Sequence, residues 1–460
     1  MTKENSDLEK LSMLDEKGHR IRINPAEVTG FFRRHRNWTQ AVLIVIFLIL
    51  PWIKIGGHQA ILLDIPNRRF AILGLTFWAH DGPLVFFILA ILTLGLALAT
   101  AVLGRVWCGW GCPQTVFIDG VFRRIEALIE GNYIKRRALD KEPISSLKLF
   151  KKTLKWTLFS IVGAIISHSF IAYFVGTEPL LKMIQSDPRE NWVAFLFTFS
   201  IAATITFDFG WFREQFCIIM CPYGRFQSVL MDDRTVNVMY DEKRGEPRKG
   251  SVPQGQTQGD CVNCLRCVNV CPTGIDIRNG TQMECIGCTA CIDACDEIMI
   301  KVKKPKGLIS YSSLTKEPIN FTRPRTLLYS ALIILALIGL TYFVSTRKPI
   351  TYQVLRGKEA PYTLSQNSTG DGLVINHFRL NIHNQTFEDK DIPIETPPEW
   401  KDKGFSLATP ESLVKIRAGE SKMIHFFVTS PTSLMKGTGR LDTQILIDRQ
   451  PFGITLLGPL

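Results

Sequence analysis

The sequence predicts a polytopic α-helical membrane protein that carries a cysteine-rich soluble insertion and a C-terminal β domain. Three observations lead to this fold class: five long apolar runs, eight cysteines crowded into one short segment, and a cysteine-free C-terminal region of partly alternating polarity. The chain has 460 residues, which is enough for two or three domains. Its apolar fraction of 46% is ordinary, so the distribution of the apolar residues carries the prediction.

Five apolar runs are nearly uncharged and approach the length that a membrane-spanning helix needs, about 20 residues. Trp and Tyr residues lie at their edges, where amphipathic rings settle between lipid and water. These aromatic flanks and the basic loops between the runs disfavour a large soluble protein with long buried helices. The first run is the shortest and contains Pro51. The predicted spans are 38–53, 83–104, 153–176, 192–212 and 326–344.

Lys and Arg residues set the expected orientation of these spans. Residues 1–37 hold eight of them and residues 105–152 hold ten, whereas the 56–82 and 177–191 loops hold two each. The positive-inside rule therefore places the N-terminus, the 105–152 loop and the 213–325 segment in the cytoplasm. Five spans then deliver the C-terminal region outside. These loops account for much of the net charge of +12, so a lipid bilayer is the expected partner and nucleic acid is not.

These features divide the chain into five predicted parts. The 37 polar residues ahead of the first span are too many for the n-region of a cleavable signal peptide. The parts are a cytoplasmic N-terminal segment (1–37), a four-helix membrane domain with two CxxxCP motifs (38–231), a cytoplasmic cysteine-rich domain (232–325), a fifth transmembrane helix (326–346) and an exported β domain (347–460).

The strongest motif is a pair of cysteine runs, 261–271 and 285–295, that share the spacing C-x2-C-x2-C-x3-C. All twelve cysteines lie in or beside predicted cytoplasmic loops, where thiols remain reduced and act as metal ligands. A short loop with this spacing lets three thiolates face one iron–sulfur cube. Eight cysteines can alternatively form two tetrahedral zinc sites. The repeated spacing favours iron–sulfur clusters, and hence electron transfer.

The two runs resemble the bacterial two-cluster ferredoxin module, in which the fourth cysteine of each run ligates the other cluster. Asp296 replaces the expected proline after the second run, and the spacer of thirteen residues between the runs is short. Short strands at 275–277 and 299–302 are expected to flank this ferredoxin-like fold. The resemblance implies two [4Fe–4S] clusters, one held by Cys261, Cys264, Cys267 and Cys295, and the other by Cys285, Cys288, Cys291 and Cys271.

Two CxxxCP motifs follow the second and fourth apolar runs. If a helix continues through a motif, its two thiols share one face, with Cβ atoms about 5–6 Å apart. Pro113 and Pro222 then stop or kink the helix. Two such hairpins side by side bring four thiolates together near the ferredoxin-like module. The four cysteines are Cys108, Cys112, Cys217 and Cys221.

These four thiolates are candidate copper ligands. Soft thiolates select Cu(I) among biological metals. They can also donate electrons to Cu(II) while they cycle through a disulfide. The alternative is that they are small buried packing residues. Two matched pairs, each with a proline and on the same side of the membrane, favour the metal-binding interpretation.

Other candidates carry weaker signals. His168 lies inside the third span, where helix packing is a better explanation than haem ligation, since a b-type haem needs two histidines. His58 and His80 fall in the first external loop and are candidates for a quinone or metal site. Asp208, near the inner end of span four, is a candidate for proton relay or helix capping. Met220, inside the second motif, is a candidate soft ligand or a packing residue.

The basic stretch 123–155 predicts an interfacial helix that leads into span three and binds lipid phosphates. Beyond residue 347, segments such as 372–387, 421–430 and 442–448 alternate in polarity and are rich in β-branched residues. This pattern is typical of an antiparallel sandwich, and about 110 residues suit one immunoglobulin-like domain. Its expected role is docking. Three histidines of this region are expected on strand surfaces: His377, His383 and His425.

The order of these parts, together with RPRTLLY (323–329) at the entry to the fifth span, resembles the cytochrome c oxidase accessory protein family, also called CcoG, FixG or RdxA. The resemblance implies a bacterial inner-membrane cupric reductase that supplies Cu(I) for assembly of a cbb3-type oxidase. It implies a cytoplasmic electron donor, and oxidase subunits or copper chaperones as partners. Composition and spacing alone predict only a membrane iron–sulfur electron carrier.

Two further functions remain open at this point. The CxxxCP motifs and the ferredoxin-like insertion are also similar to membrane components of nitrate and nitrous-oxide reduction systems, which favours a quinol-dehydrogenase relay. A non-enzymatic scaffold, with structural clusters and an outer domain that holds oxidase subunits, is the other.

Overall fold

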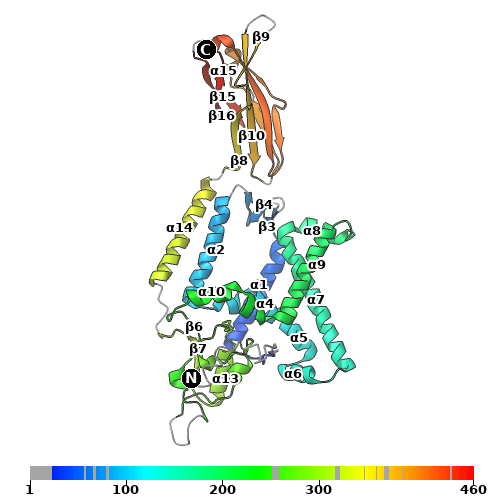
Figure 1. The fold of residues 1–460 in the computed structure, drawn as a ribbon, viewed down its shortest axis with the longest axis vertical. Coiled ribbons are helices and arrows are strands. Elements are labelled where there is room, and N and C mark those ends of the chain that lie inside the picture. The colour runs from blue at the N-terminus through cyan, green and yellow to red at the C-terminus, as the bar shows by residue number, and fades with distance from the viewer. Residues whose placement is uncertain are drawn as a thin grey trace. The chain divides into compact units, whose positions relative to one another are not determined.

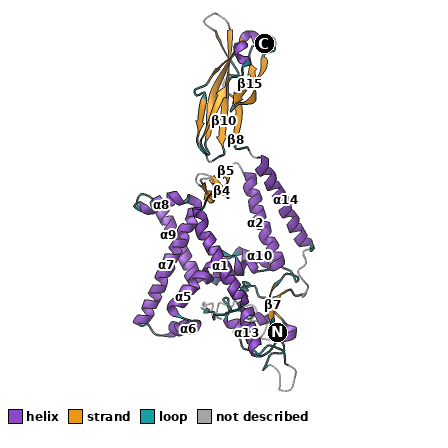
Figure 2. Cartoon of the chain, turned by 180° about the vertical axis from the view of Figure 1, so that it is seen from behind, coloured by secondary structure: helices purple, strands orange, loops and turns teal. Residues whose placement is uncertain are grey.

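The computed structural model shows two compact units, formed by residues 1–53 with 86–340 and by residues 54–85 with 341–460 (Figure 1). Helices make up most of the first unit, and strands gather in the second (Figure 2). The structure describes residues 23–55, 58–65, 69–78, 82–250, 258–315, 322–346, 348–358, 360–366, 372–386, 388–435 and 438–459.

Within the described ranges, four helices are long and apolar enough to cross a membrane. At most a third of the most apolar window of each is buried within the protein. An apolar helix whose surface stays uncovered is stable where lipid surrounds it. The four are α2 (Gly82–Leu103), α7 (Ser146–Val175), α9 (Trp192–Phe207) with its π-helical extension η3 (Asp208–Phe212), and α14 (Pro324–Thr346).

The predicted span 38–53 is not among these four helices. The described residues therefore show four of the five predicted spans. Helix α1 (Phe31–Ile49) starts ahead of the predicted span, and it therefore contains Arg33, Arg34 and Arg36. Three charges in a helix of 19 residues leave its apolar portion short. A 3₁₀ turn, η1 (Leu50–Trp52), follows at Pro51.

The start of α1 is capped by a carboxylate from a distant part of the chain. The Asp293 side chain of α13 (Ala290–Lys301) accepts hydrogen bonds from the backbone N–H groups of Phe32, at 3.2 Å, and Arg33, at 2.7 Å. A methyl group added at Gly30 would lie 2.2 Å from Cγ of Asp293. The first N–H groups of a helix have no internal partner, and a negative charge there is favourable. The cysteine-rich domain therefore determines where α1 begins.

Five short helices connect α2 to α7, where one interfacial helix over 123–155 was predicted. The chain breaks at Gly131, which has a φ of 87°, and Asn132 then caps the next helix by accepting from the Lys135 N–H. The stretch folds inward because Glu126 and Glu130 are fully buried with basic partners. The helices are α3 (Val106–Trp110), α4 (Pro113–Phe117), the π-helix η2 (Ile118–Phe122), α5 (Arg123–Glu130) and α6 (Tyr133–Lys141).

Helices α7 and α9 cross at small residues. A methyl group added at Gly163 would lie 2.2 Å from Oγ1 of Thr206, and the Ser167 hydroxyl donates to the Thr198 carbonyl at 3.0 Å. Small residues that allow close backbone approach are typical of helix contacts in membranes. Helix α8 (Thr177–Gln185) follows α7. Residues of α7 and η3 also contribute to an aromatic-rich buried core, which consists of Phe117, Ile118, Phe122, Phe159, Ile166 and Phe209.

The cysteine-rich domain is closed by two antiparallel strands that the sequence did not indicate, β6 (Asn237–Tyr240) and β7 (Ile309–Ser312). The predicted strands at 275–277 and 299–302 are wrong. Asp276 caps a 3₁₀ turn, and α13 continues through Met299. The other elements are η4 (Phe216–Met220, a π-helix), α10 (Pro222–Leu230), α11 (Glu242–Gly245), α12 (Arg266–Asn269) and η5 (Ile277–Asn279).

The C-terminal part of the second unit is a sandwich of two antiparallel sheets, which confirms the predicted immunoglobulin-like domain. Buried and half-buried residues alternate along the central strand β10 (Gly372–Asn384), because successive side chains point to opposite faces. One sheet has the order β12 (Ser406–Ala408), β14 (Ser421–Pro431), β10 and β8 (Ile350–Arg356), with β9 (Thr363–Gln366) also paired to β10. The other has the order β13 (Leu413–Ile416), β11 (Lys390–Glu395), β15 (Arg440–Ile447) and β16 (Gln450–Leu457).

Two small elements of the sandwich and two short sheets complete the second unit. The elements are α15 (Glu399–Asp402) and η6 (Thr432–Leu434), and the short sheets pair β1 (Lys54–Ile55) with β2 (His58–Gln59), and β3 (Ile61–Asp64) with β4 (Arg69–Ile72) and β5 (Leu75–Trp78).

Replacing Asp293 by Ala should lower the free energy of unfolding by about 1–2 kcal/mol, because two N–H groups at the start of α1 lose their acceptor. Denaturation of the detergent-solubilised protein, followed by circular dichroism, measures this change. The matched control is Glu297→Ala on the same helix, whose exposed pair with Lys301 contributes about 0.5 kcal/mol or less. Equal losses in the two variants would contradict a long-range cap.

Candidate functional site

The two cysteine runs adopt the same loop conformation. The residue before the second cysteine of each run, Asn263 or Gly287, has a positive φ of 52° or 65°. The residue after it, Leu265 or Thr289, has a φ of 57° or 63°. Left-handed conformations at non-glycine residues are uncommon and cost energy, so they mark a loop whose shape serves a site. The repeated spacing in the sequence is therefore a repeated turn in space.

The eight thiols of these loops line two cavities. Each cavity combines three cysteines of one run with the last cysteine of the other, and apolar residues such as Ile275 and Leu308 form much of the remaining wall. The first cavity is lined by Cys261, Cys264, Cys267 and Cys295, and the second by Cys271, Cys285, Cys288 and Cys291, with Cys267 at the boundary of both.

The electrostatics of the thiols follow the same grouping. Burial raises the pKa of Cys271 to about 12, with a further contribution from Cys288. Burial also raises the pKa of Cys295 to about 12, with a contribution from Cys267. The pKa of Cys291 is raised well above its ordinary value by burial and then by Cys288. These thiols are therefore protonated when no metal is bound, and binding of iron releases protons.

The arrangement fits a cluster better than a single ion. Among the described residues, no three His, Cys, Asp or Glu side chains converge closely enough to hold one metal ion. A structural zinc site needs four ligands at about 2.0–2.3 Å from one centre. Four thiols that surround a cavity, with the Gly287 N–H directed to Sγ of Cys285 at 3.4 Å, suit a cube whose sulfurs accept such hydrogen bonds.

The CxxxCP motifs differ from the continuous helices considered above. Cys108 lies in α3 and Cys217 in η4, but Cys112 and Cys221 each stand outside a helix, with extended ψ angles of 126° and 110°. A proline disfavours the helical conformation of the residue before it and suits the first position of a new helix. Pro113 therefore begins α4 in the same way that Pro222 begins α10. Each motif is a helix, a corner at the second cysteine, and a second helix.

The four thiols of these motifs share one neighbourhood. Burial raises the pKa of Cys108 to about 11, and the charges of Cys112 and Cys221 add to the shift. Burial also raises the pKa of Cys217, with contributions from Glu214 and then from the same thiols. The fully buried Gln227 side chain donates to Sγ of Cys108 at 3.2 Å. The two motifs are thus brought together, but three of their thiols do not surround one point.

The first motif docks directly on the second cysteine run. A methyl group added at Gly109 would lie 2.4 Å from the Gly287 carbonyl oxygen, and one added at Gly287 would lie 2.8 Å from the Arg105 carbonyl oxygen. Arg105 donates to the carbonyls of Met283 and, at 2.8 Å, Cys285. Two glycines facing each other allow this backbone contact.

The first cysteine run differs at the corresponding position. Asn263 stands where the second run has Gly287, and its side chain accepts from Arg278 at 2.6 Å. The first cysteines of the two CxxxCP motifs, Cys108 and Cys217, contact a small buried core that contains Cys288 and Ile286 of the second cysteine run. The second cavity is therefore the one adjacent to the CxxxCP motifs.

The remaining candidates are placed as follows. His168 directs Nδ1 to the Ala164 carbonyl one turn earlier, at 2.7 Å, as a packed helix residue does. Asp208 accepts from the Gln114 side chain at 3.0 Å and so joins the end of α9 to the first motif. Met220 is exposed. His80 lies outside the described residues, and His58 lies in β2.

On the second unit, His377 and His425 stack across neighbouring strands, with Nε2 and Nδ1 2.8 Å apart. His383 lies on the same central strand, β10. Sequence reasoning missed Gly109, Gln227 and Asp293. The glycine in CGWGC (108–112) and the one in CIGC (285–288) were the available signals, because a glycine beside a ligand often marks close backbone approach.

Comparison with known proteins identifies iron–sulfur domains in the chain. Three family models match the chain: "4Fe-4S dicluster domain" over residues 212–314, "4Fe-4S binding domain" over 84–133, and "IG-like fold at C-terminal of FixG" over 340–455. The last description also classes FixG as a candidate oxidoreductase. The iron–sulfur matches cover both cysteine runs and both CxxxCP motifs.

Similar proteins match most of the chain. Protein RdxB of Cereibacter sphaeroides is 38% identical over 422 residues, which are 87% of this chain and 87% of that protein. The chain belongs to the FixG/RdxA/RdxB family. In this family, protein RdxA of the same organism is 33% identical over 93% of this chain and 94% of its own length. The nitrogen fixation protein FixG of Rhizobium meliloti is 32% identical over 82% and 79%.

A crystal structure of a FixG-related protein from Vibrio parahaemolyticus matches 25% of this chain and 100% of its own length, with 12% identity and a TM-score of 0.18.

The family membership and the four apolar helices together make the chain a multi-pass membrane protein with 4Fe-4S binding domains.

Replacing Gly109 by Ala should lower the free energy of unfolding by about 1–3 kcal/mol, because the added methyl group overlaps backbone that cannot rotate away. Visible absorbance of the iron–sulfur chromophore during heating should also disappear at a lower temperature. The control is Gly95→Ala in α2, where the methyl group meets nothing within 4 Å. Unchanged stability of the Gly109 variant would contradict direct docking of the motif.

Proposed function

We propose that this protein is a membrane-bound iron–sulfur oxidoreductase that reduces Cu(II) to Cu(I) for assembly of a cbb3-type cytochrome c oxidase. The observation that carries the proposal is the docking of the first CxxxCP motif on the loop of the second cysteine run. The [4Fe–4S] clusters supply one-electron transfer when bound. Their proposed ligands are Cys261, Cys264, Cys267 and Cys295 for one cluster, and Cys271, Cys285, Cys288 and Cys291 for the other.

Copper is the substrate in this proposal, and the thiols of the two CxxxCP motifs receive it. Each Cu(II) gains one electron and becomes Cu(I), which thiolates bind in preference to harder metals. Cys108 and Cys217 contact the core that contains Cys288, so bound copper would lie next to the second cysteine run. The thiols lose their protons on binding, which Gln227 supports by donating to Cys108. The family resemblance supplies the oxidase or its copper chaperones as the partners that take up Cu(I).

The membrane topology of the proposal has five spans, with α1 as the first. Helix α1 and η1 together cover residues 31–52, which is about 33 Å of helix at 1.5 Å per residue. The Tyr173 hydroxyl near the end of α7 donates to the Phe47 carbonyl at 2.8 Å, so the two helices end side by side. Arg33 and Arg36 pair with Asp119, which reduces the cost of their charges.

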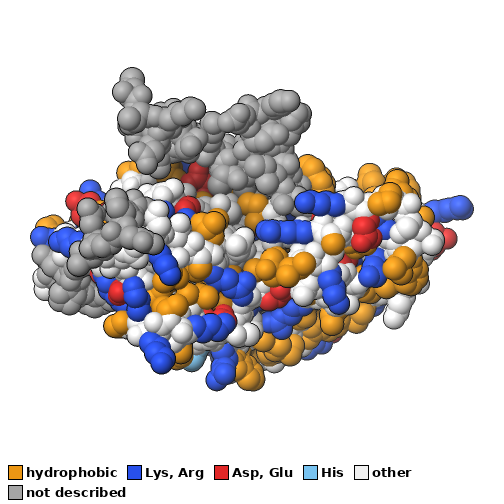
Figure 3. Space-filling model, turned by 90° about the horizontal axis from the view of Figure 1, so that it is seen from below, with side chains coloured by type: hydrophobic (Ala, Val, Ile, Leu, Met, Phe, Trp, Pro, Cys, Tyr) orange, Lys and Arg blue, Asp and Glu red, His pale blue; other side chains and the backbone are white. Residues whose placement is uncertain are grey.

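The proposed orientation puts the N-terminus and the cysteine runs in the bacterial cytoplasm and the sandwich domain in the periplasm. Figure 3 shows Lys and Arg side chains spread over the described part of the face seen from below. Cytoplasmic surfaces beside anionic lipids carry such an excess.

The topology is tested with fusions of alkaline phosphatase, which is active only in the periplasm. A fusion after residue 348 should be active, and fusions after residues 145 and 232 should be inactive. Fusion immunoblots control for expression level. An inactive fusion at 348 would reduce the number of spans to four.

The copper proposal is tested with the variant in which Cys108, Cys112, Cys217 and Cys221 are all replaced by Ser. Anaerobically purified protein with chemically reduced clusters should lose at least tenfold in its rate of Cu(II) reduction, while its iron content and EPR signals persist. Met220→Leu is the control, because this exposed Met sits inside the second motif and should leave the rate unchanged. Full reduction by the quadruple variant would contradict the proposal. If quinol reduces the clusters and the protein does not reduce Cu(II), a quinol-dehydrogenase electron relay would be supported instead.

A further inference from the structure

A cationic cavity of about 260 Å³ lies between the N-terminal segment, α1, α5 and the second cysteine run. It belongs wholly to the first unit, and neither the sequence motifs nor the copper proposal uses it. Arginines supply most of its polar lining, and Cys288 of the second cysteine run also lines it. Five arginines and two carboxylates line it: Arg33, Arg36, Arg123, Arg124, Arg136, Asp119 and Glu27.

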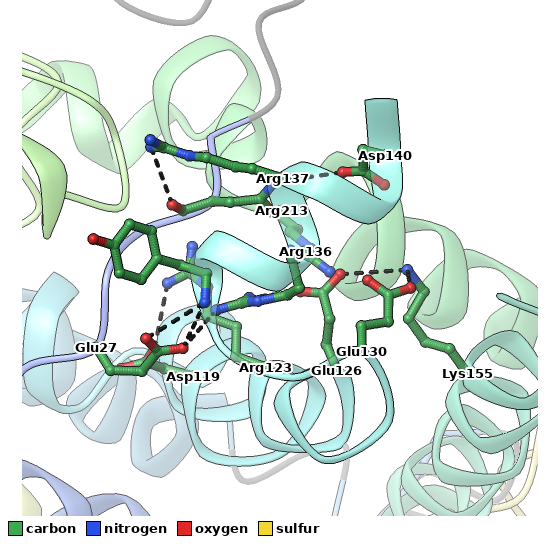
Figure 4. Close-up of polar contacts among 12 residues, drawn as sticks. Glu27, Asp119, Arg123, Glu126, Glu130, Arg136, Arg137, Asp140, Lys155 and Arg213 are labelled. Carbon is green, nitrogen blue, oxygen red and sulfur yellow. Dashed lines mark hydrogen bonds and ion pairs between the residues drawn. The ribbon is translucent and has the colours of Figure 1, made fainter. Parts of the chain in front are cut away.

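The two carboxylates are already engaged by their neighbours (Figure 4). Asp119 pairs with Arg33 and Arg36, each at 2.5 Å, and with Arg123 at 3.3 Å. Glu27 accepts from Arg136 at 3.0 Å. No ion pair or hydrogen bond joins the exposed Arg124 side chain to another described residue. Carboxylates outside the wall pair with two more of its arginines, Glu214 with Arg123 at 2.6 Å and Glu126 with Arg136 at 3.3 Å. Arg124 therefore carries the positive charge that no described carboxylate pairs with.

Hydrogen-bond donors in this wall also lack acceptors. The Nε atoms of Arg36, Arg123 and Arg136 are buried, and none has an acceptor among the described residues. These three side chains are at most 11% exposed. A buried donor that remains unsatisfied costs about 1–3 kcal/mol, and more when it is charged. Hydrogen-bonding capacity therefore remains unused in three of the arginines that line this cavity.

The composition of the wall specifies the chemistry of that ligand. Guanidinium groups match the oxygens of phosphate with paired N–H donors and hold a charge that does not titrate. Much of the remaining lining is apolar and includes Ala26, Val28, Val270 and Ala290. The volume is close to that of small-molecule pockets, which begin at about 300 Å³. A phosphate group with a small organic moiety fits both parts of the lining.

We propose that this cavity binds the phosphate group of a small anion, with Arg36, Arg123, Arg124 and Arg136 as the binding residues. Because Cys288 lines the same cavity, the bound negative charge lies beside the second cysteine run and disfavours the addition of an electron there. Phosphate binding thus lowers the reduction potential of the adjacent cluster. The effect on the reduction potential rests on the proposed electron-transfer function, whereas phosphate binding itself does not.

The test uses the full-length protein in nanodiscs of phosphatidylcholine, in phosphate-free buffer and without copper. Isothermal titration with inorganic phosphate and with pyrophosphate should show saturable binding at one site. Arg124→Gln should weaken binding at least fivefold, and Arg124→Lys should restore part of it. Arg124 is chosen because its side chain is exposed. Its replacement therefore removes no ion pair or hydrogen bond to another described residue. Lys301→Gln, an exposed change on α13, is the control and should bind as the unaltered protein does.

Two further measurements decide the source of the phosphate and its effect. In nanodiscs that contain phosphatidylglycerol, weaker binding of pyrophosphate would identify a lipid headgroup as the ligand, and unchanged binding would identify a soluble phosphate compound. The cavity site stands in either case. Redox titration followed by EPR should show one cluster shifted to lower potential by pyrophosphate, and no shift in Arg124→Gln. Absence of saturable binding, or equal binding by Arg124→Gln, would overturn the proposal. Because no copper is present, this failure is distinguishable from failure of the copper proposal.

Discussion

The backbone contact between Gly109 and Gly287 is the constraint on which the rest of the first unit depends. A side chain on either residue would separate the CxxxCP motif from the second cysteine run. With both side chains absent, Arg105 reaches the carbonyls of that run, and the Trp110 indole donates to the Tyr311 hydroxyl at 3.2 Å. Electron transfer requires short distances and a fixed path, and a contact between two backbones supplies both more reliably than flexible side chains would.

Buried charge reinforces this contact. Arg36 donates to the Cys288 carbonyl at 3.0 Å and also pairs with Asp119, so one side chain joins α1, η2 and the cysteine loop. Glu126 is fully buried and contacts Arg136, Lys155 and Arg213. Burying one ion costs several kcal/mol unless partners and hydrogen bonds compensate, so these groups stabilise the fold only as a set. The set requires its helices to assemble together, which links the membrane helices to the cysteine-rich domain.

The parts of the fold that local pattern determines were predicted from the sequence. Uninterrupted apolar runs such as 83–104 became helices, and alternation around residues 372–387 became the central strand of the sandwich. Predictions failed where a distant partner overrides local preference. Helix α1 begins at Phe31 because Asp293 caps it. The apolar residues near Met299 continue α13 because Met299 is buried in the core of the cysteine-rich domain. The basic stretch after residue 123 folds inward because its own glutamates are buried with it. No local signal reports such pairings.

The sequence alone determined the candidate ligands, because residue type and spacing are properties of short segments: x2, x2, x3 between thiols restricts a loop to a few conformations. Only the tertiary structure decided how the segments combine. It decided that the last cysteine of each run faces the cavity of the other, that Gly109 meets Gly287, and that five arginines surround one cavity. These outcomes depend on residues far apart in the chain, whose approach is governed by packing and by the neutralisation of buried charge.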